Sequence, residues 1–539
     1  MQEDEAVHEI ARAWLRAEPD ADVRAELHGL LDGDPAELVA RFTGRLSFGT
    51  AGLRAAIGAG PLRMNRLVVR QAAAGVVDAL LQDDPVDADR GLLIGFDARH
   101  KSRDFAFDTA RVAAARGMRV VIAAEPIPTP VLAWNIARLG VAAGVMVTAS
   151  HNPAQDNGYK VYLETGAQIV PPWDRRMAEA IAAVDPVAVP LADAASSMIR
   201  IVDAELVDQY LDAVSAVRFG SGDLRIAYTA LHGVGGAVAM RAFAAAGFTD
   251  VTVVSAQQDP DPDFPTVAFP NPEEPGAMDL VLDLARRLGA DIAVAHDPDA
   301  DRLGVAVPSA VGAASGWRLL SGDEIGWLLA DHILRNTSGE DRLVVTTVVS
   351  SSLLGKMARA AGVHFAETFT GFKWIANAVV RRPEARLVFA YEQALGYLVA
   401  GRPLDKDGIT AALVMADLAA ELKNAGRSIE DRLDEIARRF GRHMTAEASV
   451  RMDPAAAVAV VERWRANPPE EIGGRRVVAM EDFPEAMLLR LWVEGSGENV
   501  RLQVRPSGTE PKVKVYGEGV GEDPTEFVQV MASYLARRE

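Results

Sequence analysis

Short apolar runs alternate with segments of helical periodicity through most of the chain. In the first part, apolar runs at 91–96, 119–123 and 144–148 are separated by periodic segments such as 105–116. The short runs are typical of buried strands, and the periodic segments are typical of amphipathic helices. Because alternating strands and helices form parallel or mixed sheets covered by helices, this part is predicted to be an α/β unit.

The same alternation recurs twice further along the chain. In the second part we predict strands at 224–228, 251–255 and 291–295, and helices at 236–246 and 277–288. In the third part we predict strands at 343–349, 363–367 and 387–391, and helices at 323–334, 353–361 and 372–380. Three similar α/β units with mixed sheets are therefore expected.

The two ends of the chain show other patterns. Residues 7–31 have helical spacing of apolar side chains and predict an N-terminal helical cap. A long helix is predicted at 408–424, and the last part resembles a small α+β domain with strands at 486–493, 499–504 and 512–516 and a helix at 526–537. With 539 residues and roughly 150 residues per domain, we expect four domains, at 1–205, 206–315, 316–440 and 441–539.

The composition excludes several classes of function. Acidic residues outnumber basic ones by 19 and no basic cluster offsets them, so binding of nucleic acid through its phosphates is not expected. Cysteine is absent, which excludes disulfides, thiolate nucleophiles and cysteine zinc sites. No stretch of about 18 residues is apolar enough to span a membrane, and the acidic start does not resemble a signal peptide. We expect a cytoplasmic protein without a membrane partner, and its oligomeric state stays open.

The segment TASHNPAQDNGYK follows the predicted strand that ends at 148. It places Ser150 and His151 at the strand's exit, predicts a turn at Asn157 and Gly158, and has Lys160 beyond that turn. Because ligands of open α/β sheets bind outside the carboxyl ends of the strands, we expect Ser150 to be exposed there. The Gly-x-Ser-x-Gly pattern of hydrolases is missing, so the strained strand-to-helix turn of those enzymes is not expected. A serine and an asparagine that cap an ordinary turn are the alternative.

The loop HDPDADR follows the predicted strand at 291–295 and carries Asp297, Asp299 and Asp301. Three carboxylates at this spacing repel one another unless a hard cation neutralises them, and oxygen ligands suit Mg²⁺. An EF-hand is excluded because Arg302 stands where that loop needs glycine. A solvated turn is the alternative, and we assign that structure to the proline-rich loop at 259–263, where three aspartates have the same spacing.

Near the C-terminus, RPSGTEPK joins two predicted strands. It presents the side chains or backbone of Arg505, Ser507, Gly508, Thr509 and Lys512. Small residues let backbone N–H groups approach an anion, hydroxyls add donors, and arginine binds phosphate in a bidentate manner. The segment therefore suits a phosphate dianion, and a hairpin turn is the alternative.

Further polar side chains follow or flank other predicted strands. Glu392 and Gln393, in YEQALGY, could bind vicinal hydroxyls of a polyol, although a solvated loop or helix cap is the alternative. Lys373 begins a predicted helix, Lys406 lies in LDKDG, and Arg54 lies in the glycine-rich FGTAGLR. Together with the lysines at 160 and 512, these three basic residues could form a local cationic surface for an anionic substrate.

Six of these motifs in this order resemble the α-D-phosphohexomutase superfamily, particularly its phosphoglucomutase and phosphopentomutase branch. The motifs are FGTAGLR, TASHNPAQDNGYK, DPDADR, YEQALGY, LDKDG and RPSGTEPK, and they extend from about residue 48 to residue 516. The resemblance implies that Ser150 is phosphorylated. It also implies that Asp297, Asp299 and Asp301 hold Mg²⁺ together with the phosphoryl oxygen on Ser150.

The resemblance also implies roles for the remaining candidates. Arg54, His151, Lys160 and Lys373 match active-site residues, and Lys373 is the candidate for proton transfer. The groups implied in substrate binding are Arg302, Glu392, Gln393 and Lys406, and, in the distal phosphate site, Arg505, Ser507, Gly508, Thr509 and Lys512. Many relatives have serine where this chain has Ala394, which leaves both hexose and pentose substrates open.

The implied activity is a phosphosugar mutase that interconverts glucose 1-phosphate and glucose 6-phosphate. It would use a phosphoserine and a sugar bisphosphate that serves as intermediate and activator, in a central cleft to which each domain contributes one motif. Mannose and pentose phosphates are alternative substrates. The competing functions are a Mg²⁺-dependent phosphatase in which Asp297 attacks phosphorus, and a non-catalytic protein that binds sugar phosphates.

Overall fold

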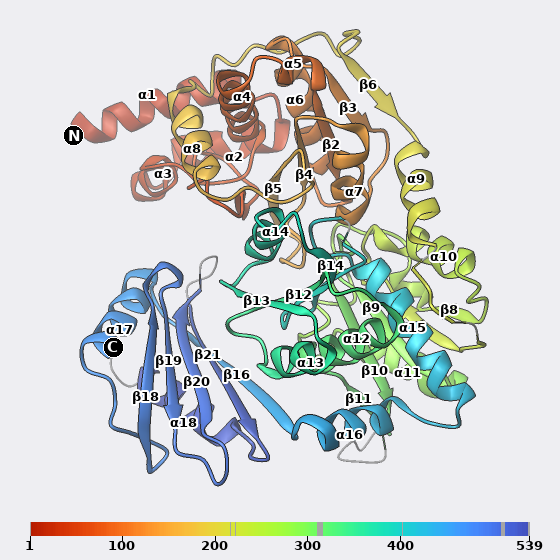
Figure 1. Ribbon diagram of the computed structural model, residues 1–539. Helices are drawn as coiled ribbons and strands as arrows, with labels where there is room; N and C mark the ends of the chain where they lie inside the picture. Colours follow the sequence, from red (N-terminus) through yellow and green to blue (C-terminus); the bar gives the residue numbers. More distant parts are fainter. Residues whose placement is uncertain are drawn as a thin grey trace. The chain divides into compact units, whose positions relative to one another are not determined.

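The chain forms two compact units in the computed structural model, which describes residues 2–215, 217–220, 222–309, 316–401, 403–507 and 512–536. The first unit comprises Met1–Leu320, Val379–Arg382 and Leu395–Asn424. The second comprises Ser321–Ala378, Pro383–Ala394 and Ala425–Glu539. Figure 1 labels their helices and strands. Within the described ranges, no helix has the length and apolarity needed to cross a membrane.

The first unit contains a six-stranded mixed sheet with the order β1-β5-β4-β2-β3-β6. Its strands are β1 (Leu53–Ala56), β2 (Leu92–Phe96), β3 (Val120–Ala123), β4 (Ala143–Val147), β5 (Asp156–Leu163) and β6 (Ile199–Val202). Strands β2, β3, β4 and β6 are parallel, whereas β1 and β5 are antiparallel to their neighbours. All residues of β2 and β4 are buried because α6 (Ser102–Ala115) and α7 (Thr129–Leu139) pack on them.

Several helices surround this sheet. Those within the α/β part are α4 (Arg66–Asp83), α5 (Asp87–Arg90), α8 (Trp173–Ala183) and α9 (Glu205–Val214), and those of the cap are α1 (Gln2–Ala17), α2 (Ala21–Asp32) and α3 (Pro35–Phe42). The predicted cap is confirmed as helical. It is interrupted at Pro19, which has no backbone N–H to donate, and Asp20 then caps α2 by accepting from the Asp22 N–H.

A second mixed sheet in the first unit has the order β11-β10-β9-β7-β8. Its strands are β7 (Ile226–Thr229), β8 (Val251–Val253), β9 (Ile292–His296), β10 (Leu303–Pro308) and β11 (Trp317–Leu319). Its helical segments are α10 (Gly235–Ala245), η1 (Ser255–Gln257) and α11 (Asp279–Leu288). A later segment with β15 (Gly396–Val399) and α15 (Gly408–Asn424) returns to this unit, where α15 packs against β9 and β10.

The second unit begins with another α/β part. Strand β12 (Arg342–Thr347) pairs in parallel with β13 (His364–Thr368) on one side and β14 (Arg386–Glu392) on the other. The helices of this part are α12 (Gly322–Asn336), α13 (Leu353–Ala361), α14 (Phe372–Val380) and α16 (Ile429–Phe440). A capping box of Ser321 and Glu324 begins α12, where each side chain bonds the other residue's backbone N–H.

The last part of the second unit is an antiparallel sheet with the order β16-β21-β20-β19-β18-β17. Its strands are β16 (His443–Arg451), β17 (Glu471–Ile472), β18 (Arg475–Phe483), β19 (Leu488–Val493), β20 (Val500–Pro506) and β21 (Lys512–Val520). The helical segments are α17 (Pro454–Ala466), η2 (Pro484–Ala486) and α18 (Thr525–Ala536). Residues such as Val461, Trp464, Leu502 and Met531 form the core between helices and sheet.

The observed elements confirm the expected fold class of α/β units with mixed sheets followed by a small α+β domain. Each predicted helix and strand is observed, with ends that differ by a few residues, and the structure adds elements that were not predicted, such as α4, β5, β16 and β18. Helix α4 was not predicted because it is buried on most of its surface and therefore lacks a polar face. Strand β18 was not predicted because most of its residues are exposed.

A buried ionic cluster supports the second unit. Glu518 on β21 is 4 % exposed, and its Oε2 lies 2.8 Å from Arg501 Nη2. Its Oε1 accepts hydrogen bonds from Ser351 Oγ at 2.5 Å and from the Ser352 N–H at 2.9 Å, and lies 2.9 Å from His443 Nδ1. Burial alone would raise the pKa of Glu518, but the Arg501 charge and the contact with His443 lower it to about 2.

We predict that Glu518→Gln destabilises the second unit in a pH-dependent way. At neutral pH the variant leaves the Arg501 charge buried without its counter-ion, which costs about 3–5 kcal/mol. Because the folded-state pKa of Glu518 lies below the ordinary value of 4.5, its stabilisation is present above pH 4.5 and is lost as pH falls toward 2. The difference between wild type and variant should shrink by about 3 kcal/mol over that interval.

Urea titrations at a series of pH values measure this difference. A free-energy gap between the two proteins that stays constant from pH 7 down to pH 2 would contradict the assigned pKa.

Candidate active site

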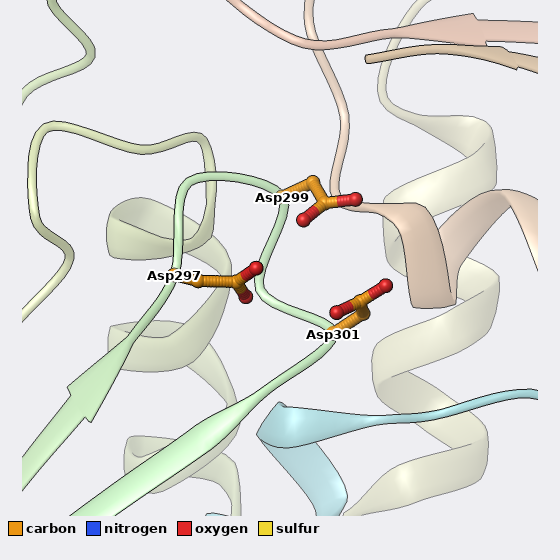
Figure 2. Close-up of side chains that lie close together, drawn as sticks. All are labelled: Asp297, Asp299 and Asp301. Atoms are coloured by element: carbon orange, nitrogen blue, oxygen red, sulfur yellow. The ribbon is translucent and has the colours of Figure 1, made fainter. Parts of the chain in front are cut away.

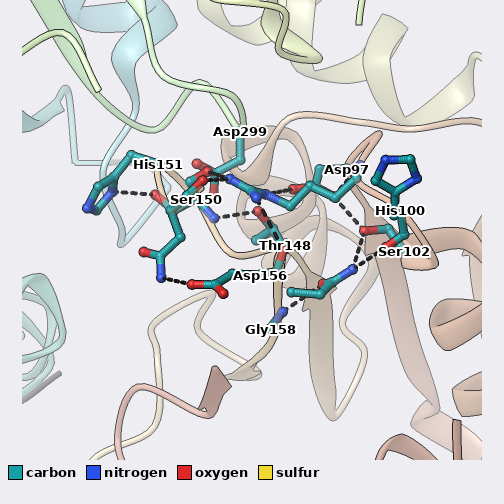
Figure 3. A network of polar contacts seen from close by, with 12 residues as sticks. Asp97, His100, Ser102, Thr148, Ser150, His151, Asp156, Gly158 and Asp299 are labelled. Carbon is teal, nitrogen blue, oxygen red and sulfur yellow. Dashed lines mark hydrogen bonds and ion pairs between the residues drawn. The ribbon is translucent and has the colours of Figure 1, made fainter. Parts of the chain in front are cut away.

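Ser150 lies in the loop between β4 and β5 (Figure 3). Its Oγ donates a hydrogen bond to Asp297 Oδ2 at 2.9 Å and lies 3.2 Å from His151 Nδ1. Its backbone N–H donates to Thr148 Oγ1 at 2.8 Å. The expected exposure is wrong, because Ser150 packs against the aspartate loop and is only 3 % exposed. Ser150 lies between two strands and holds a φ of +53°, a strained conformation for a residue other than glycine.

The three aspartates lie in the loop between β9 and β10 (Figure 2). Asp297, Asp299 and Asp301 are fully buried, and one carboxylate oxygen of each lies within 4.8 Å of the others. The described part of the chain contains no other cluster of three metal-ligating side chains this close together. By contrast, Asp259 and Asp263 of the second loop with this spacing are exposed, as expected.

Two lysines contact this aspartate triad. Lys160, which is 6 % exposed, has its Nζ 2.8 Å from Asp299 Oδ2 and 3.2 Å from Asp301 Oδ2. Lys406 lies in the segment between β15 and α15, and its Nζ is 3.2 Å from Asp301 Oδ2. Both predicted lysines are therefore close to the triad carboxylates.

The pairing of β1 with β5 places Arg54 in the same neighbourhood. The predicted turn at Asn157 and Gly158 is wrong, because both residues belong to β5 and Gly158 pairs with Arg54 of β1. The guanidinium of Arg54 donates from Nη1 to Asn152 Oδ1 at 3.0 Å. Strand β5 thus connects the serine loop, Arg54 and Lys160.

The triad has the electrostatic character of a cation site. Asp299 Oδ1 and Asp301 Oδ1 are buried and accept no hydrogen bond within the described structure. Burial and the two neighbouring carboxylates raise the pKa of Asp297 well above its ordinary value. Burial alone would also raise the pKa of Asp299, but the Lys160 ammonium holds it below its ordinary value. Buried oxygen ligands with excess negative charge fit a hard divalent cation.

Arg302 and His151 complete the surroundings of Ser150. The backbone N–H of Arg302 donates to Asp297 Oδ1 at 3.0 Å, which helps to orient that carboxylate. The pKa of His151 lies well below its ordinary value. Burial is the largest cause, and the positive charges of Arg302 and Arg54 lower the pKa further. The imidazole beside Ser150 is therefore neutral at pH 7.

Two contacts that support the triad were not found in the sequence. Thr129, at the start of α7, donates from Oγ1 to Asp299 Oδ2 at 2.7 Å and from its backbone N–H to Asp299 O at 2.9 Å. The loop after β7 packs directly on the triad loop, since a Cβ on Gly233 would lie 2.4 Å from Pro298 Cα. Two features of the sequence could have indicated these contacts: Thr129 stands between two prolines at the start of a helix, and the segment after β7 is rich in glycine.

The second unit holds the predicted sugar loop. Glu392, at the end of β14, accepts a hydrogen bond at Oε1 from the Gly371 N–H at 3.0 Å, just before the helix that carries Lys373. Gln393 Oε1 accepts from Ser350 Oγ at 2.9 Å, and the Gln393 N–H donates to the same hydroxyl at 3.2 Å. Glu392, Gln393 and Lys373 therefore come from adjoining segments.

The predicted phosphate loop joins β20 to β21, as expected. Arg505 lies near the end of β20, and the Ser507 N–H donates to Lys512 O at 2.8 Å, which closes the loop at its base. Gly508 and Thr509 lie outside the described residues.

The order of the parts along the chain matches the four domains of one enzyme family. Models of the phosphoglucomutase/phosphomannomutase family match the chain in order, with α/β/α domain I at 45–187, domain II at 207–311, domain III at 321–440 and the C-terminal domain at 411–531. The chain belongs to this family, within the α-D-phosphohexomutase superfamily. It is accordingly an isomerase, an intramolecular phosphotransferase.

Individual relatives are similar over nearly their whole length. A Haemophilus influenzae protein named "Probable phosphomannomutase" is 39% identical over 483 residues, which are 87% of this chain and 96% of that protein. The human phosphopentomutase is 33% identical over 564 residues, covering 96% of this chain and 92% of that protein. The solved structure of the Paramecium phosphoglucomutase parafusin has a TM-score of 0.67 at 19% identity, covering 92% of this chain and 96% of that one, and shows the same fold.

We predict that Asp299→Asn weakens binding of a divalent cation by about 10-fold or more, because the amide removes a negative charge from the triad. Titration calorimetry with Mn²⁺ and Mg²⁺ measures the affinity without any substrate. The matched control is Asp259→Asn, which changes an exposed aspartate with the same sequence spacing and should leave the affinity unchanged. Equal affinities of wild type and Asp299→Asn would contradict the assignment of the site.

Proposed function

We propose that this enzyme interconverts glucose 1-phosphate and glucose 6-phosphate, with Ser150 as the carrier of the transferred phosphoryl group. The observation that carries the proposal is the hydrogen bond of 2.9 Å from Ser150 Oγ to Asp297, which places a hydroxyl at the edge of a buried aspartate triad. The membership of the chain in a family of mutases supports the same reaction class.

The proposed reaction has two balanced steps. Phosphoserine 150 donates its phosphoryl group to a free sugar hydroxyl: the P–Oγ bond breaks, a P–O bond to the sugar forms, the hydroxyl proton passes to a base, and Ser150 Oγ takes up a proton. The sugar bisphosphate then turns in the site and returns its other phosphoryl group: that sugar O–P bond breaks, the P–Oγ bond forms again, and the serine proton passes to the sugar oxygen. Because phosphoserine and the sugar phosphates are all phosphate monoesters, the transfers are nearly balanced in free energy and the reaction is reversible.

In this proposal the triad and the phosphoryl oxygen on Ser150 hold Mg²⁺, whose chemistry is to stabilise negative charge on the transferring phosphoryl group. Lys160 Nζ lies 2.8 Å from Asp299 Oδ2 and 3.2 Å from Asp301 Oδ2, and its positive charge holds the pKa of Asp299 below its ordinary value. Neutral His151 presents Nδ1 to Ser150 Oγ at 3.2 Å and orients that hydroxyl. Arg54, Arg302 and Lys406 supply positive charge for the substrate's phosphate groups.

Recognition of the sugar is assigned to the second unit. Glu392 and Gln393 would bind sugar hydroxyls, and their fixed contacts with Gly371 and Ser350 support that role. Lys373 is the proposed acceptor of the hydroxyl proton. It lies two residues after Gly371, whose backbone N–H contacts Glu392 of the sugar loop. Arg505, Ser507, Gly508, Thr509 and Lys512 would bind the idle phosphate. A sugar bisphosphate would act as activator, and we place the enzyme in the cytoplasm as a protein without nucleic acid or membrane partners.

The phosphatase alternative is less well supported. In that reaction a carboxylate of Asp297 would attack phosphorus and water would release inorganic phosphate. The Asp297 carboxylate instead accepts hydrogen bonds on both oxygens, from Ser150 Oγ and from the Arg302 N–H, which reduces its nucleophilicity. The non-catalytic alternative is less well supported, since the relatives described above carry the names of mutases.

We predict that Ser150→Ala loses mutase activity by on the order of 10⁴-fold or more, because the phosphoryl carrier is removed. A coupled assay with glucose 1-phosphate, Mg²⁺ and catalytic glucose 1,6-bisphosphate measures the rate, and intact-mass analysis measures phosphate on the protein. Ser196→Ala, in a loop away from β4, is the control and should behave as wild type. Full activity of Ser150→Ala would overturn the carrier assignment.

We further predict that glucose 1-phosphate has the highest kcat/KM in a panel of hexose and pentose 1-phosphates. Each sugar is assayed with Mg²⁺ and its own bisphosphate, so that activation does not bias the comparison. A kcat/KM more than about 10-fold higher for mannose 1-phosphate or ribose 1-phosphate would show that the substrate is that sugar phosphate. This ratio corresponds to about 1.4 kcal/mol of transition-state binding. Mutase activity with any of the sugars leaves the role of Ser150 in place.

A further inference from the structure

Arg99 is buried directly beneath the loop that carries Ser150. It follows β2 and is 4 % exposed. Its Nη2 donates to the carbonyl oxygens of Ser150 at 2.6 Å and Asn152 at 2.5 Å. Its Nη1 donates to the carbonyl oxygens of Pro153 at 2.7 Å and Asp156 at 3.2 Å. All four terminal N–H groups of this guanidinium are therefore directed at one short loop.

The guanidinium is also fixed on its other sides. Its Nε lies 3.3 Å from Asp97 Oδ2, and Asp97 Oδ1 accepts hydrogen bonds from the Arg99 N–H at 3.0 Å and from Ser102 Oγ at 2.6 Å. The ring of Phe264 covers one face, with 4.9 Å between its centroid and the guanidinium carbon. Asp97, Ser102 and Ser150 belong to the same continuous polar network in Figure 3. These contacts leave the guanidinium one orientation.

The loop depends on a side chain of this shape. Its four carbonyl groups converge on one buried point, where they need donors, and Ser150 holds a backbone conformation that costs roughly 1–3 kcal/mol. The planar fork of arginine presents donors in several fixed directions, whereas lysine has three donors on a single nitrogen. A lysine at position 99 would keep the charge but could not bond all four carbonyls.

We propose that Arg99 is a positioning residue for Ser150. By drawing the carbonyl groups of the loop together, it holds Ser150 Oγ toward Asp297 and the triad. Arg99 acts through the backbone, since its contacts are to the carbonyl oxygen of Ser150 and its neighbours and not to Oγ. The inference rests on the proposed role of Ser150 as phosphoryl carrier.

A single-turnover labelling experiment tests this role. Unphosphorylated enzyme in excess is mixed with Mg²⁺ and glucose 1,6-bisphosphate labelled with ³²P. A sugar O–P bond breaks, the P–Oγ bond to Ser150 forms, and the serine proton passes to the sugar oxygen. Arg99→Lys should slow this labelling about 100-fold, the loss typical of a reacting group displaced by about 1 Å. The enzyme concentration that gives the half-maximal labelling rate should change little, because the substrate-binding groups are intact.

A second measurement separates positioning from general destabilisation. In Arg99→Lys, hydrogen exchange of backbone amides at 149–157 should become faster, while exchange in α15 stays as in wild type. The control is Arg103→Lys. Arg103 also donates to a carbonyl, Ala124 O at 2.6 Å, and lies over the Phe107 ring at 4.5 Å, but it does not contact the serine loop. Its labelling rate should be that of wild type.

Each outcome decides the proposal. A folded Arg99→Lys with the labelling rate and loop exchange of wild type would overturn it. If that variant does not fold, Phe264→Leu, which removes only the ring over the guanidinium, is measured in the same two ways, and unchanged values overturn the proposal. Labelling of Ser150→Ala at the wild-type rate would instead reject the proposed function. Loss of labelling in Ser150→Ala together with a normal rate in Arg99→Lys would reject this inference alone.

Discussion

Repulsion among three buried carboxylates is the constraint around which the first unit is arranged. Two unit charges at 4 Å interact by about 4 kcal/mol at an effective dielectric constant of 20, so three aspartates within 4.8 Å of one another need compensation. The protein supplies part of it with Lys160, Lys406 and the hydroxyl of Thr129. Asp299 Oδ1 and Asp301 Oδ1 still accept no hydrogen bond from the residues that the structure describes, and a divalent cation is the group that fits them.

The same constraint explains why a late segment of the chain returns to the first unit. A Cβ on Gly408, at the start of α15, would lie 2.3 Å from Arg302 O, so the helix can begin there only with glycine. His296 Nε2 lies 3.0 Å from Gly408 O, and Lys406 reaches Asp301 from just before the helix. The triad loop is thus enclosed by β9, β10 and α15, although α15 lies more than a hundred residues further along the chain.

The strands and helices of the α/β parts could be predicted because the two leave different patterns in the sequence. Buried strands appear as short apolar runs, whereas amphipathic helices have apolar residues three or four positions apart. The aspartate loop could be predicted for a similarly local reason, since all three aspartates lie within five residues after one strand. Arg99 and Thr129 could not, because each acts on a segment distant in sequence through ordinary hydrogen bonds. The positive φ of Ser150 was also hidden, because no glycine marks it and the hydrogen bonds that accompany it come from Arg99 and Thr148.

Within the second unit, one loop joins the candidate sugar site to the candidate phosphate site. Ser350 exchanges hydrogen bonds with Gln393 through its hydroxyl, and its carbonyl oxygen accepts from Arg501 Nη2 on β20 at 2.6 Å. Gln503, on the same strand, donates to Val348 O at 2.7 Å. Strand β20 leads directly to Arg505. Because the bonds of Arg501 and Gln503 are buried, a shift of β20 strains the loop that carries Ser350 and contacts Gln393, so the two recognition elements are expected to move as one body.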